Sequence, residues 1–178
     1  MPEVARQVIT VFGSSRPAPG SELYETARRL GAALARAGFR VASGGYGGVM
    51  EGVSRGAREA GGKTIGVTAA VFRSPANAWV EEEIRVATWQ ERLLKLVELG
   101  AGYVVLPGGT GTLVELAVAW EWINKGFLDP RPVVVLGDFW RLVVETIPTA
   151  ELRLNPILRA ATVEEAVALL VQHTSRQA

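Results

Sequence analysis

The sequence predicts an α/β protein built on a doubly wound parallel sheet with helices on both faces. Short apolar runs rich in β-branched residues alternate along the chain with segments whose apolar residues recur at helical spacing. Glycine-rich turns follow several of these strand-like runs. No low-complexity segment or long linker interrupts the alternation, so residues 1–178 are expected to form a single domain.

The first part of the chain begins with a β-rich run at residues 8–12, which Gly13-Ser14-Ser15 interrupts. Ser21 is expected to cap a helix that continues to about residue 37 and ends at Gly38. The next expected elements are strands at residues 40–43 and 64–67, with a helix between them that runs from a glycine-rich turn to about residue 60.

The second part begins with residues 68–83, which have no regular pattern and are expected to be irregular. They are followed by an expected strand at residues 84–87, a helix at 88–99, a strand at 103–106, a helix from Thr112 to about 125, a strand at 133–136, and helices at 139–147 and 163–173. Parallel strands require crossover connections, and ligands of such sheets bind beyond the carboxyl ends of the strands. The glycine-rich turns all follow strands and are therefore expected to line one crevice.

Composition excludes several classes of function. The formal net charge of +1 gives no reason to expect nucleic acid or an anionic membrane as a partner. The absence of cysteine excludes disulfides and thiol catalysis, and the single histidine, His173, makes a catalytic triad or a histidine metal site implausible. Neither a metal nor a cofactor is expected. No secretory signal or long apolar span is recognisable, so the cytoplasm is the expected compartment.

The most informative segment is Pro107-Gly108-Gly109-Thr110-Gly111-Thr112-Leu113-Val114-Glu115, between an apolar strand and a helical pattern. One interpretation is structural, because Thr112 and Glu115 have the spacing of a capping box. The other is an anion site, because glycines let a ligand approach the backbone and free N–H groups at a helix N-terminus bind phosphate. A cap needs only one hydroxyl, so the run of glycines and threonines favours the anion site.

Two further turns have two possible interpretations each. The turn containing Gly44, Gly45, Gly47 and Gly48 matches neither a P-loop nor a dinucleotide fingerprint. It is either a tight turn before a closely packed helix or the second wall of a ligand crevice. The small residues around Ser14 are either a plain turn or a contact for a sugar or phosphate.

Arg92 lies on an expected helix whose apolar face includes Leu93 and Leu96. Taken by itself, it is typical of a solvated arginine that pairs with Glu91 or Glu98.

Several of these segments resemble a known family. Gly44-Gly45-Tyr46-Gly47-Gly48-Val49-Met50-Glu51 resembles the glycine-rich, methionine-containing segment of the proteins once labelled "possible lysine decarboxylase". Residues 107–115 resemble their Pro-Gly-Gly-x-Gly-Thr-x-x-Glu signature, and Arg92 has the position of the arginine in their Met-x-x-Arg-Lys segment. The best-understood members are the LOG ("lonely guy") proteins, which are cytokinin riboside 5′-monophosphate phosphoribohydrolases. The likeness extends over about residues 8 to 170.

The resemblance implies that residues 1–178 form a single Rossmann-like nucleotide-binding domain, which assembles as a homodimer or higher homo-oligomer. It also implies release of the base from a nucleoside 5′-monophosphate without a cofactor. It implies that Arg92 and Glu115 are the catalytic pair. The residues that it places on the phosphate are Gly108, Gly109, Thr110, Gly111 and Thr112.

The chain departs from the family pattern at Trp89 and Leu93, where the motif has methionine and lysine. Some relatives bind nucleotides or phosphorylated cofactors without established hydrolysis, among them the molybdenum-cofactor carriers. A binding protein without turnover is therefore the alternative function. The decarboxylase label fails, because pyridoxal-phosphate chemistry needs a lysine in the site and no glycine-rich turn contains one.

Overall fold

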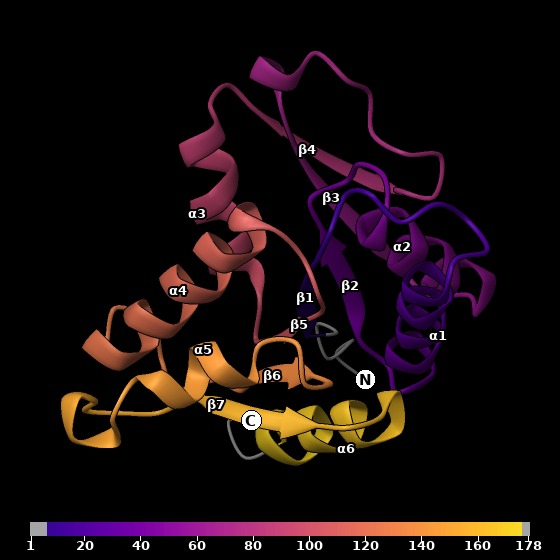
Figure 1. Cartoon of the computed structure of the whole chain (residues 1–178). Helices are drawn as coiled ribbons and strands as arrows, with labels where there is room; N and C mark the ends of the chain where they lie inside the picture. The colour runs from indigo at the N-terminus through magenta and orange to yellow at the C-terminus, as the bar shows by residue number, and fades with distance from the viewer. Residues whose placement is uncertain (1–6, 176–178) are drawn as a thin grey trace, which may run out of the picture.

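A computed structural model describes residues 7–175 and has one seven-stranded sheet in which every strand pair is parallel. The helices alternate with the strands and cover both faces of the sheet (Figure 1). The strands are β1 (Val8–Phe12), β2 (Arg40–Ser43), β3 (Thr64–Ala69), β4 (Glu82–Val86), β5 (Gly102–Val105), β6 (Val133–Leu136) and β7 (Ile157–Ala160). The helices are α1 (Glu22–Arg36), α2 (Val49–Glu59), α3 (Trp89–Leu99), α4 (Thr110–Lys125), α5 (Arg141–Thr146) and α6 (Val163–Thr174), with short 3₁₀ turns η1 (Ala70–Phe72) and η2 (Thr149–Glu151). The predicted fold class is confirmed.

The strand order is β4-β3-β2-β1-β5-β6-β7, so the direction in which strands are added reverses beside β1. β1 pairs with β2 through Ile9 and Val41, and with β5 through Phe12 and Val105. In open α/β sheets, the crevice beyond the carboxyl ends of the strands at such a switch point is where ligands bind. The loops after β1 and β5 meet at this place.

Each face of the sheet has its own apolar core. Ile9 and Val11 of β1 face the layer of α1, α2 and α6, whereas Phe12 packs in the layer of α3 and α4. This alternation follows from the two-residue side-chain period of a strand. Helices α1, α2, α3, α4 and α6 each bury apolar side chains on one side, which is the pattern that predicted them, whereas α5 buries none.

The structure corrects several predicted boundaries. β3 extends to Ala69, and β4 begins at Glu82 rather than at residue 84, because its exposed charged residues hide the strand pattern. α5 is shorter than residues 139–147, since the Trp140 indole donates to the Leu106 carbonyl and holds the preceding residues in a bend. β7 was not predicted; it is a short, half-buried edge strand that carries Arg159.

Ser21 and Thr162 occupy N-cap positions but differ in what their hydroxyls bind. Ser21 occupies the N-cap position of α1, but its hydroxyl donates to the Ala18 carbonyl and caps no helical N–H. Thr162 does cap α6 by accepting from the N–H of Glu165. The Glu165 carboxylate accepts from Ala161, one residue before the position that a closed capping box uses.

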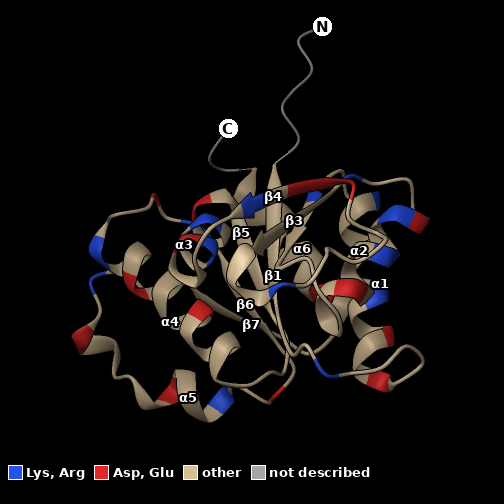
Figure 2. Cartoon of the chain, turned by 90° about the horizontal axis from the view of Figure 1, so that it is seen from above, with Lys and Arg blue, Asp and Glu red and all other residues tan. Residues whose placement is uncertain are grey.

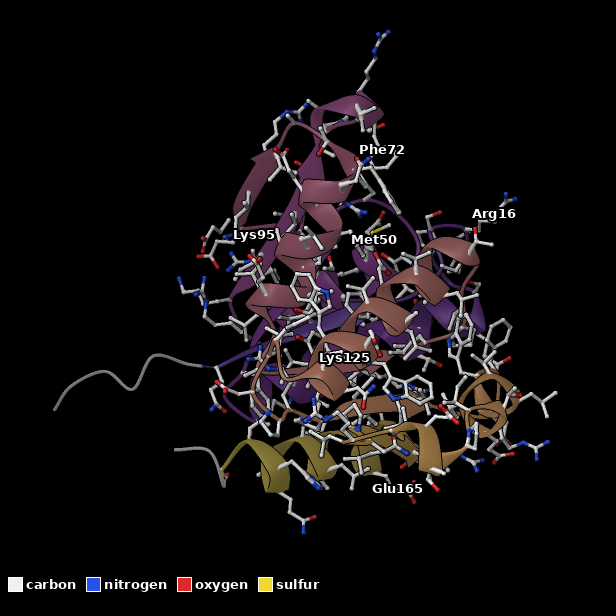
Figure 3. All side chains as sticks on the ribbon, turned by 90° about the vertical axis from the view of Figure 1, so that its left-hand side faces the viewer. Arg16, Met50, Phe72, Lys95, Lys125 and Glu165 are labelled. Atoms are coloured by element: carbon white, nitrogen blue, oxygen red, sulfur yellow. The ribbon has the colours of Figure 1, made fainter. Side chains whose placement is uncertain are left out.

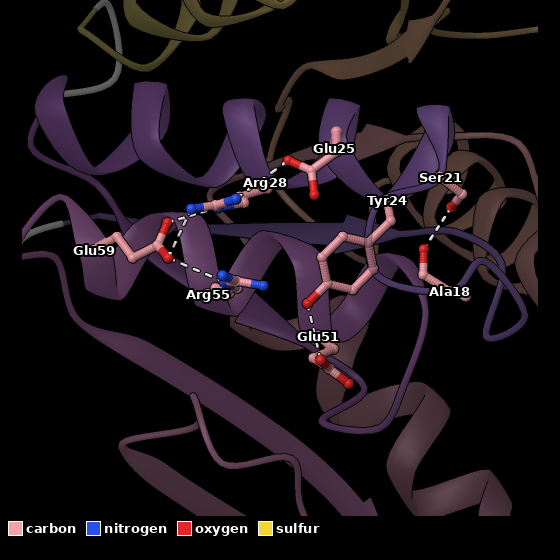
Figure 4. A network of polar contacts seen from close by, with 8 residues as sticks. All are labelled: Ala18, Ser21, Tyr24, Glu25, Arg28, Glu51, Arg55 and Glu59. Carbon is pink, nitrogen blue, oxygen red and sulfur yellow. Dashed lines mark hydrogen bonds and ion pairs between the residues drawn. The ribbon is translucent and has the colours of Figure 1, made fainter.

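Charged residues lie around the periphery in mixed sign (Figure 2). Edge strand β4 carries Glu82, Glu83 and Arg85, which discourages pairing with another sheet edge. Between α1 and α2, Arg28 donates to Glu59 at 2.7 Å and Arg55 donates to the same carboxylate at 3.0 Å (Figure 4). Within residues 7–175, no helix is both long enough and apolar enough to span a bilayer.

Candidate functional site

A cleft with a volume of about 1110 Å³ opens beyond the carboxyl ends of the central strands. Its wall combines loops that are far apart in the sequence: Ser14 follows β1, Tyr46 follows β2, Phe72 follows β3 and Gly108 follows β5. The predicted crevice therefore exists at the switch point of the sheet.

One wall of the cleft is the N-terminus of α4. The helix begins at Thr110, its N-cap Gly109 has no side-chain cap, and the first helical hydrogen bond runs from the Leu113 N–H to the Gly109 carbonyl. The N–H groups of the three residues before Leu113 precede that bond, and Thr110, Gly111 and Thr112 all line the cleft. Such a terminus attracts anions through its free donors and its dipole.

The predicted capping box of Thr112 and Glu115 is wrong. α4 begins two residues earlier than expected, so Thr112 is inside the first turn and Glu115 lies beyond it. Thr112 is buried and its hydroxyl packs beside Gly108, where a Cβ on residue 108 would lie 2.1 Å from the Thr112 oxygen. Glu115 therefore has no capping role that would explain it.

The glycines of this turn have different surroundings. Gly108 is required by packing against Thr112 and against the backbone of Ser14. Cβ atoms at Gly109 and Gly111 would meet no atom within 4 Å, so the protein itself does not require glycine there. Backbone without side chains facing open space is what close approach of a ligand requires.

The glycine-rich turn after β2 combines both interpretations. Gly47 lines the cleft, as does Ser14 opposite it, whereas Gly44, Gly45 and Gly48 are not among the lining residues. A Cβ at Gly48 would lie 2.4 Å from the Ser14 carbonyl oxygen, and the Val49 N–H donates to that same oxygen. This turn therefore fastens the loop after β1 to the start of α2.

Arg92 is buried, with 7% of its surface exposed, and lines the cleft. Its Nε donates to the Val67 carbonyl at 2.8 Å and its Nη2 donates to the Gly44 carbonyl at 2.9 Å. The interpretation as a solvated surface arginine is wrong. Glu91, its expected partner, instead closes a capping box with Thr88.

Two aromatic rings that the sequence analysis did not single out enclose Arg92. The guanidinium carbon lies 5.2 Å from the centre of the Tyr46 ring and 5.6 Å from that of Phe72. Cations are attracted to ring faces at this distance. Tyr46 interrupts a run of glycines, which is a detectable signal, but nothing local in the sequence indicates that Phe72 reaches the cleft.

Glu115 lies half-buried on the cleft wall. Burial raises the pKa of this carboxyl to about 7, and the positive charge of Arg92 partly opposes the increase. Burial in turn lowers the pKa of Arg92, while Glu115 and Tyr46 raise it. A carboxyl of this kind exchanges protons near neutral pH, which is typical of a functional site.

The segment after β3 completes the cleft. Phe72 and Asn77 line it, and the Asn77 side-chain amide donates to the Tyr46 carbonyl at 2.8 Å. Trp89, at the first position of α3, also lines it and is 39% exposed. Residues 68–83 were predicted only as irregular.

No three His, Cys, Asp or Glu side chains in the described part of the chain form a group that could hold a metal.

Comparisons with known proteins place the chain in a family. A model described as the SLOG cluster4 family matches residues 6–167, and the chain belongs to this family. A cytokinin riboside 5′-monophosphate phosphoribohydrolase of Mycobacterium tuberculosis is 36% identical over 74% of this chain and 71% of its own. A protein of the same name from Rhodococcoides fascians is 31% identical over 73% of this chain and 67% of its own chain. The molybdenum cofactor binding protein of Rippkaea orientalis superposes with a TM-score of 0.79 at 26% identity, over 95% of this chain and 98% of that one. The resemblance to LOG proteins is thereby confirmed.

Proposed function

From this family membership and the geometry of the cleft, we propose that the protein is a phosphoribohydrolase. It hydrolyses the N-glycosidic bond of a nucleoside 5′-monophosphate, of the AMP or cytokinin-riboside-monophosphate type, to free base and ribose 5-phosphate. The observation that carries the proposal is the presence of three features in one cleft: the uncapped start of α4, the carboxyl of Glu115 and the buried guanidinium of Arg92. The relatives named phosphoribohydrolases support it.

The phosphate binds at the start of α4. The N–H groups of Thr110, Gly111 and Thr112 face it, and Ser14 lies beside them because its N–H donates to the Pro107 carbonyl. Binding the phosphate here anchors the substrate and orients the ribose toward Glu115, one turn further along the same helix.

Glu115 acts on the ribose. Breaking the bond between C1′ and the base nitrogen leaves the electron pair on the base and positive charge on the ribose ring, which an adjacent carboxylate stabilises. Water then forms the new bond to C1′ and transfers its proton to Glu115. With a pKa near 7, Glu115 is ionised often enough to accept this proton and acidic enough to release it to solvent again. The departing base takes up a proton from solvent water, which completes the free base.

Arg92 acts through its charge. Arginine does not release its proton in proteins, so it is not the acid that protonates the base. Its buried guanidinium, held by two backbone carbonyls, stabilises negative charge on the phosphate or on the departing base.

The test is incubation of the protein with AMP and other nucleoside monophosphates, followed by detection of free base and ribose 5-phosphate. Glu115→Gln should lower turnover by about 100-fold or more, because the amide can neither carry the charge nor take the proton. Glu121→Gln is the matched control on the same helix, since Glu121 is exposed and should be dispensable. Equal rates for parent and Glu115→Gln would refute the proposal.

The likeness to a molybdenum cofactor binding protein favours a second candidate, which is binding of a phosphorylated ligand without turnover. In that case calorimetry with AMP or the molybdenum cofactor should detect binding, while no free base appears from any nucleotide. Release of ribose 5-phosphate would exclude this second candidate.

We also propose that the protein assembles as a homodimer or higher homo-oligomer. Exposed apolar side chains lie on α4 and α5, where Leu113, Leu142 and Val143 face solvent, and they support this. Light scattering coupled to size-exclusion chromatography tests it, and a monomer at micromolar concentration would contradict it.

A further inference from the structure

Arg92 and Glu115 line the same cleft, yet no guanidinium nitrogen of Arg92 lies within 4.0 Å of a carboxylate oxygen of Glu115. An arginine in a cleft of low dielectric is strongly attracted to a neighbouring carboxylate. Something in the structure therefore holds the guanidinium elsewhere.

The two hydrogen bonds of Arg92 point it toward the ends of β2 and β3. Its Nε is held by the Val67 carbonyl and its Nη2 by the Gly44 carbonyl, with the Met50 sulfur 3.5 Å from Nη2. These acceptors are neutral, so by themselves they compete poorly with a carboxylate.

The rings of Tyr46 and Phe72 provide the additional constraint. They lie edge to face, with ring centres 5.7 Å apart and an interplanar angle of 86°, and both are within 6 Å of the guanidinium carbon. Phe72 and Met50 both line the cleft, and in Figure 3 the labelled Phe72 lies above Met50. The two rings limit the directions in which the guanidinium can move.

The two rings are held to different degrees. The Tyr46 hydroxyl accepts from the Ala69 N–H at 2.9 Å and donates to the Ala69 carbonyl at 3.2 Å, and Asn77 binds the Tyr46 backbone. Phe72 lies on η1 and is 45% exposed, so its contact with Arg92 contributes little to the core. A change at Phe72 is therefore expected to leave the fold intact.

We propose that Tyr46 and Phe72 are positioning residues that hold Arg92 on the two backbone carbonyls and prevent it from collapsing onto Glu115. The proposal rests on the proposed function, because it explains how the two catalytic groups remain separate and available to substrate. The charged or titratable groups that line the cleft are Arg16, Tyr46, Arg92 and Glu115. Of these groups, Arg92 is the cation whose charge lowers the pKa of Glu115.

The experiment is titration of the Glu115 carboxyl by carbon-detected NMR in the free protein. Replacing Phe72 by leucine or Tyr46 by leucine should let Arg92 approach Glu115 and lower the midpoint by about one pH unit, since an adjacent cation stabilises the carboxylate. Tyr46→Phe keeps the ring and should leave the midpoint close to that of the parent. In an active protein, the pH profile of kcat should shift in the same direction.

Easier entry of water would also lower the midpoint, so the Phe72→Leu comparison is repeated in an Arg92→Gln background. If the rings act through Arg92, Phe72→Leu has no effect on Glu115 once Arg92 is gone. An equal fall in both backgrounds, or no fall in either, would overturn the proposal.

Circular dichroism checks the fold of each variant. If Tyr46→Leu does not fold, Phe72→Leu alone decides the outcome. The titration needs no turnover, so loss of the proposed hydrolase function and failure of this positioning role give different results.

Discussion

The turn at residues 44–48 and the turn at residues 107–112 both follow parallel strands and both lead into helices, but their glycines have different neighbours. In the first turn, Cβ atoms at Gly44 and Gly48 would strike Arg92 and the Ser14 backbone. In the second, Cβ atoms at Gly109 and Gly111 would extend into open space. Glycine serves protein packing at Gly44 and Gly48, whereas it leaves backbone open to the cleft at Gly109 and Gly111.

Each turn is also linked to one of the two charged side chains of the cleft. The first turn supplies the Gly44 carbonyl that holds Arg92, whereas the second begins the helix that carries Glu115. Substitutions at Gly44 and Gly48 should therefore disturb the protein itself, whereas those at Gly109 and Gly111 should disturb ligand binding.

The largest expected effect is that of Gly48→Ala. The φ of Gly48 is +67° and its Cβ would lie 2.4 Å from the Ser14 oxygen, so alanine brings both backbone strain and a clash with backbone. The free energy of unfolding should fall by about 2–4 kcal/mol, measured by chemical denaturation. Gly47→Ala is the control, because its Cβ would lie 3.6 Å from the nearest atom. Similar losses for both variants would contradict the packing role.

Gly44→Ala should reduce activity more than stability. Its Cβ would lie 1.7 Å from Nη2 of Arg92, and the end of a long side chain can move away where backbone cannot. We expect turnover of AMP to fall by about 100-fold through displacement of the guanidinium. Denaturation of the same variant should show a smaller change than Gly48→Ala, and parental turnover would show that the position of Arg92 is unimportant.

Glu115, on the helix that follows the second turn, should make the free energy of unfolding depend on pH. Burial raises the pKa of Glu115 from 4.5 to about 7, so between these values the folded protein binds more protons than the unfolded chain. The stabilisation is complete below about pH 4.5 and is lost as the pH rises through 7, with a total of about 2 kcal/mol after allowance for partial solvent access.

The difference in unfolding free energy between the parent and Glu115→Gln, followed from pH 4.5 to 8, isolates this contribution. A difference that does not change with pH would mean that Glu115 titrates normally.

The smallest effect is expected for Gly111→Ala. Alanine favours helix formation over glycine, and its methyl group would meet no atom within 4 Å, so stability should be unchanged or rise by up to about 1 kcal/mol. The affinity for AMP should fall by about 10-fold, because the methyl group occupies space that a phosphate needs. Calorimetry in the Glu115→Gln background measures the affinity for AMP without turnover. If Gly111→Ala lost stability but kept normal affinity for AMP, Gly111 would serve protein packing rather than ligand binding.

The sequence was sufficient for the sheet, the layers and the place of the cleft. Strands and helices of this chain bury apolar side chains at regular periods, and glycine-rich turns after parallel strands must meet at one edge of the sheet. It failed where one local pattern fits two structures: the spacing of Thr112 and Glu115 matches a capping box, but α4 begins at Thr110. The half-buried edge strand β7 was missed for a similar reason, since its short run lacks a clear period.

By itself, then, the sequence determined the parallel fold and the glycine-rich turns, and its resemblance to a known family indicated the candidate pair of Arg92 and Glu115. Only the tertiary structure decided that Arg92 is buried between Tyr46 and Phe72, and that Glu115 lies on the cleft wall rather than in a cap. The physical reason is that burial and electrostatic environment arise from segments far apart in the chain. Val67 and Gly44 reach Arg92 across 25 and 48 residues of sequence, and no local pattern encodes such contacts.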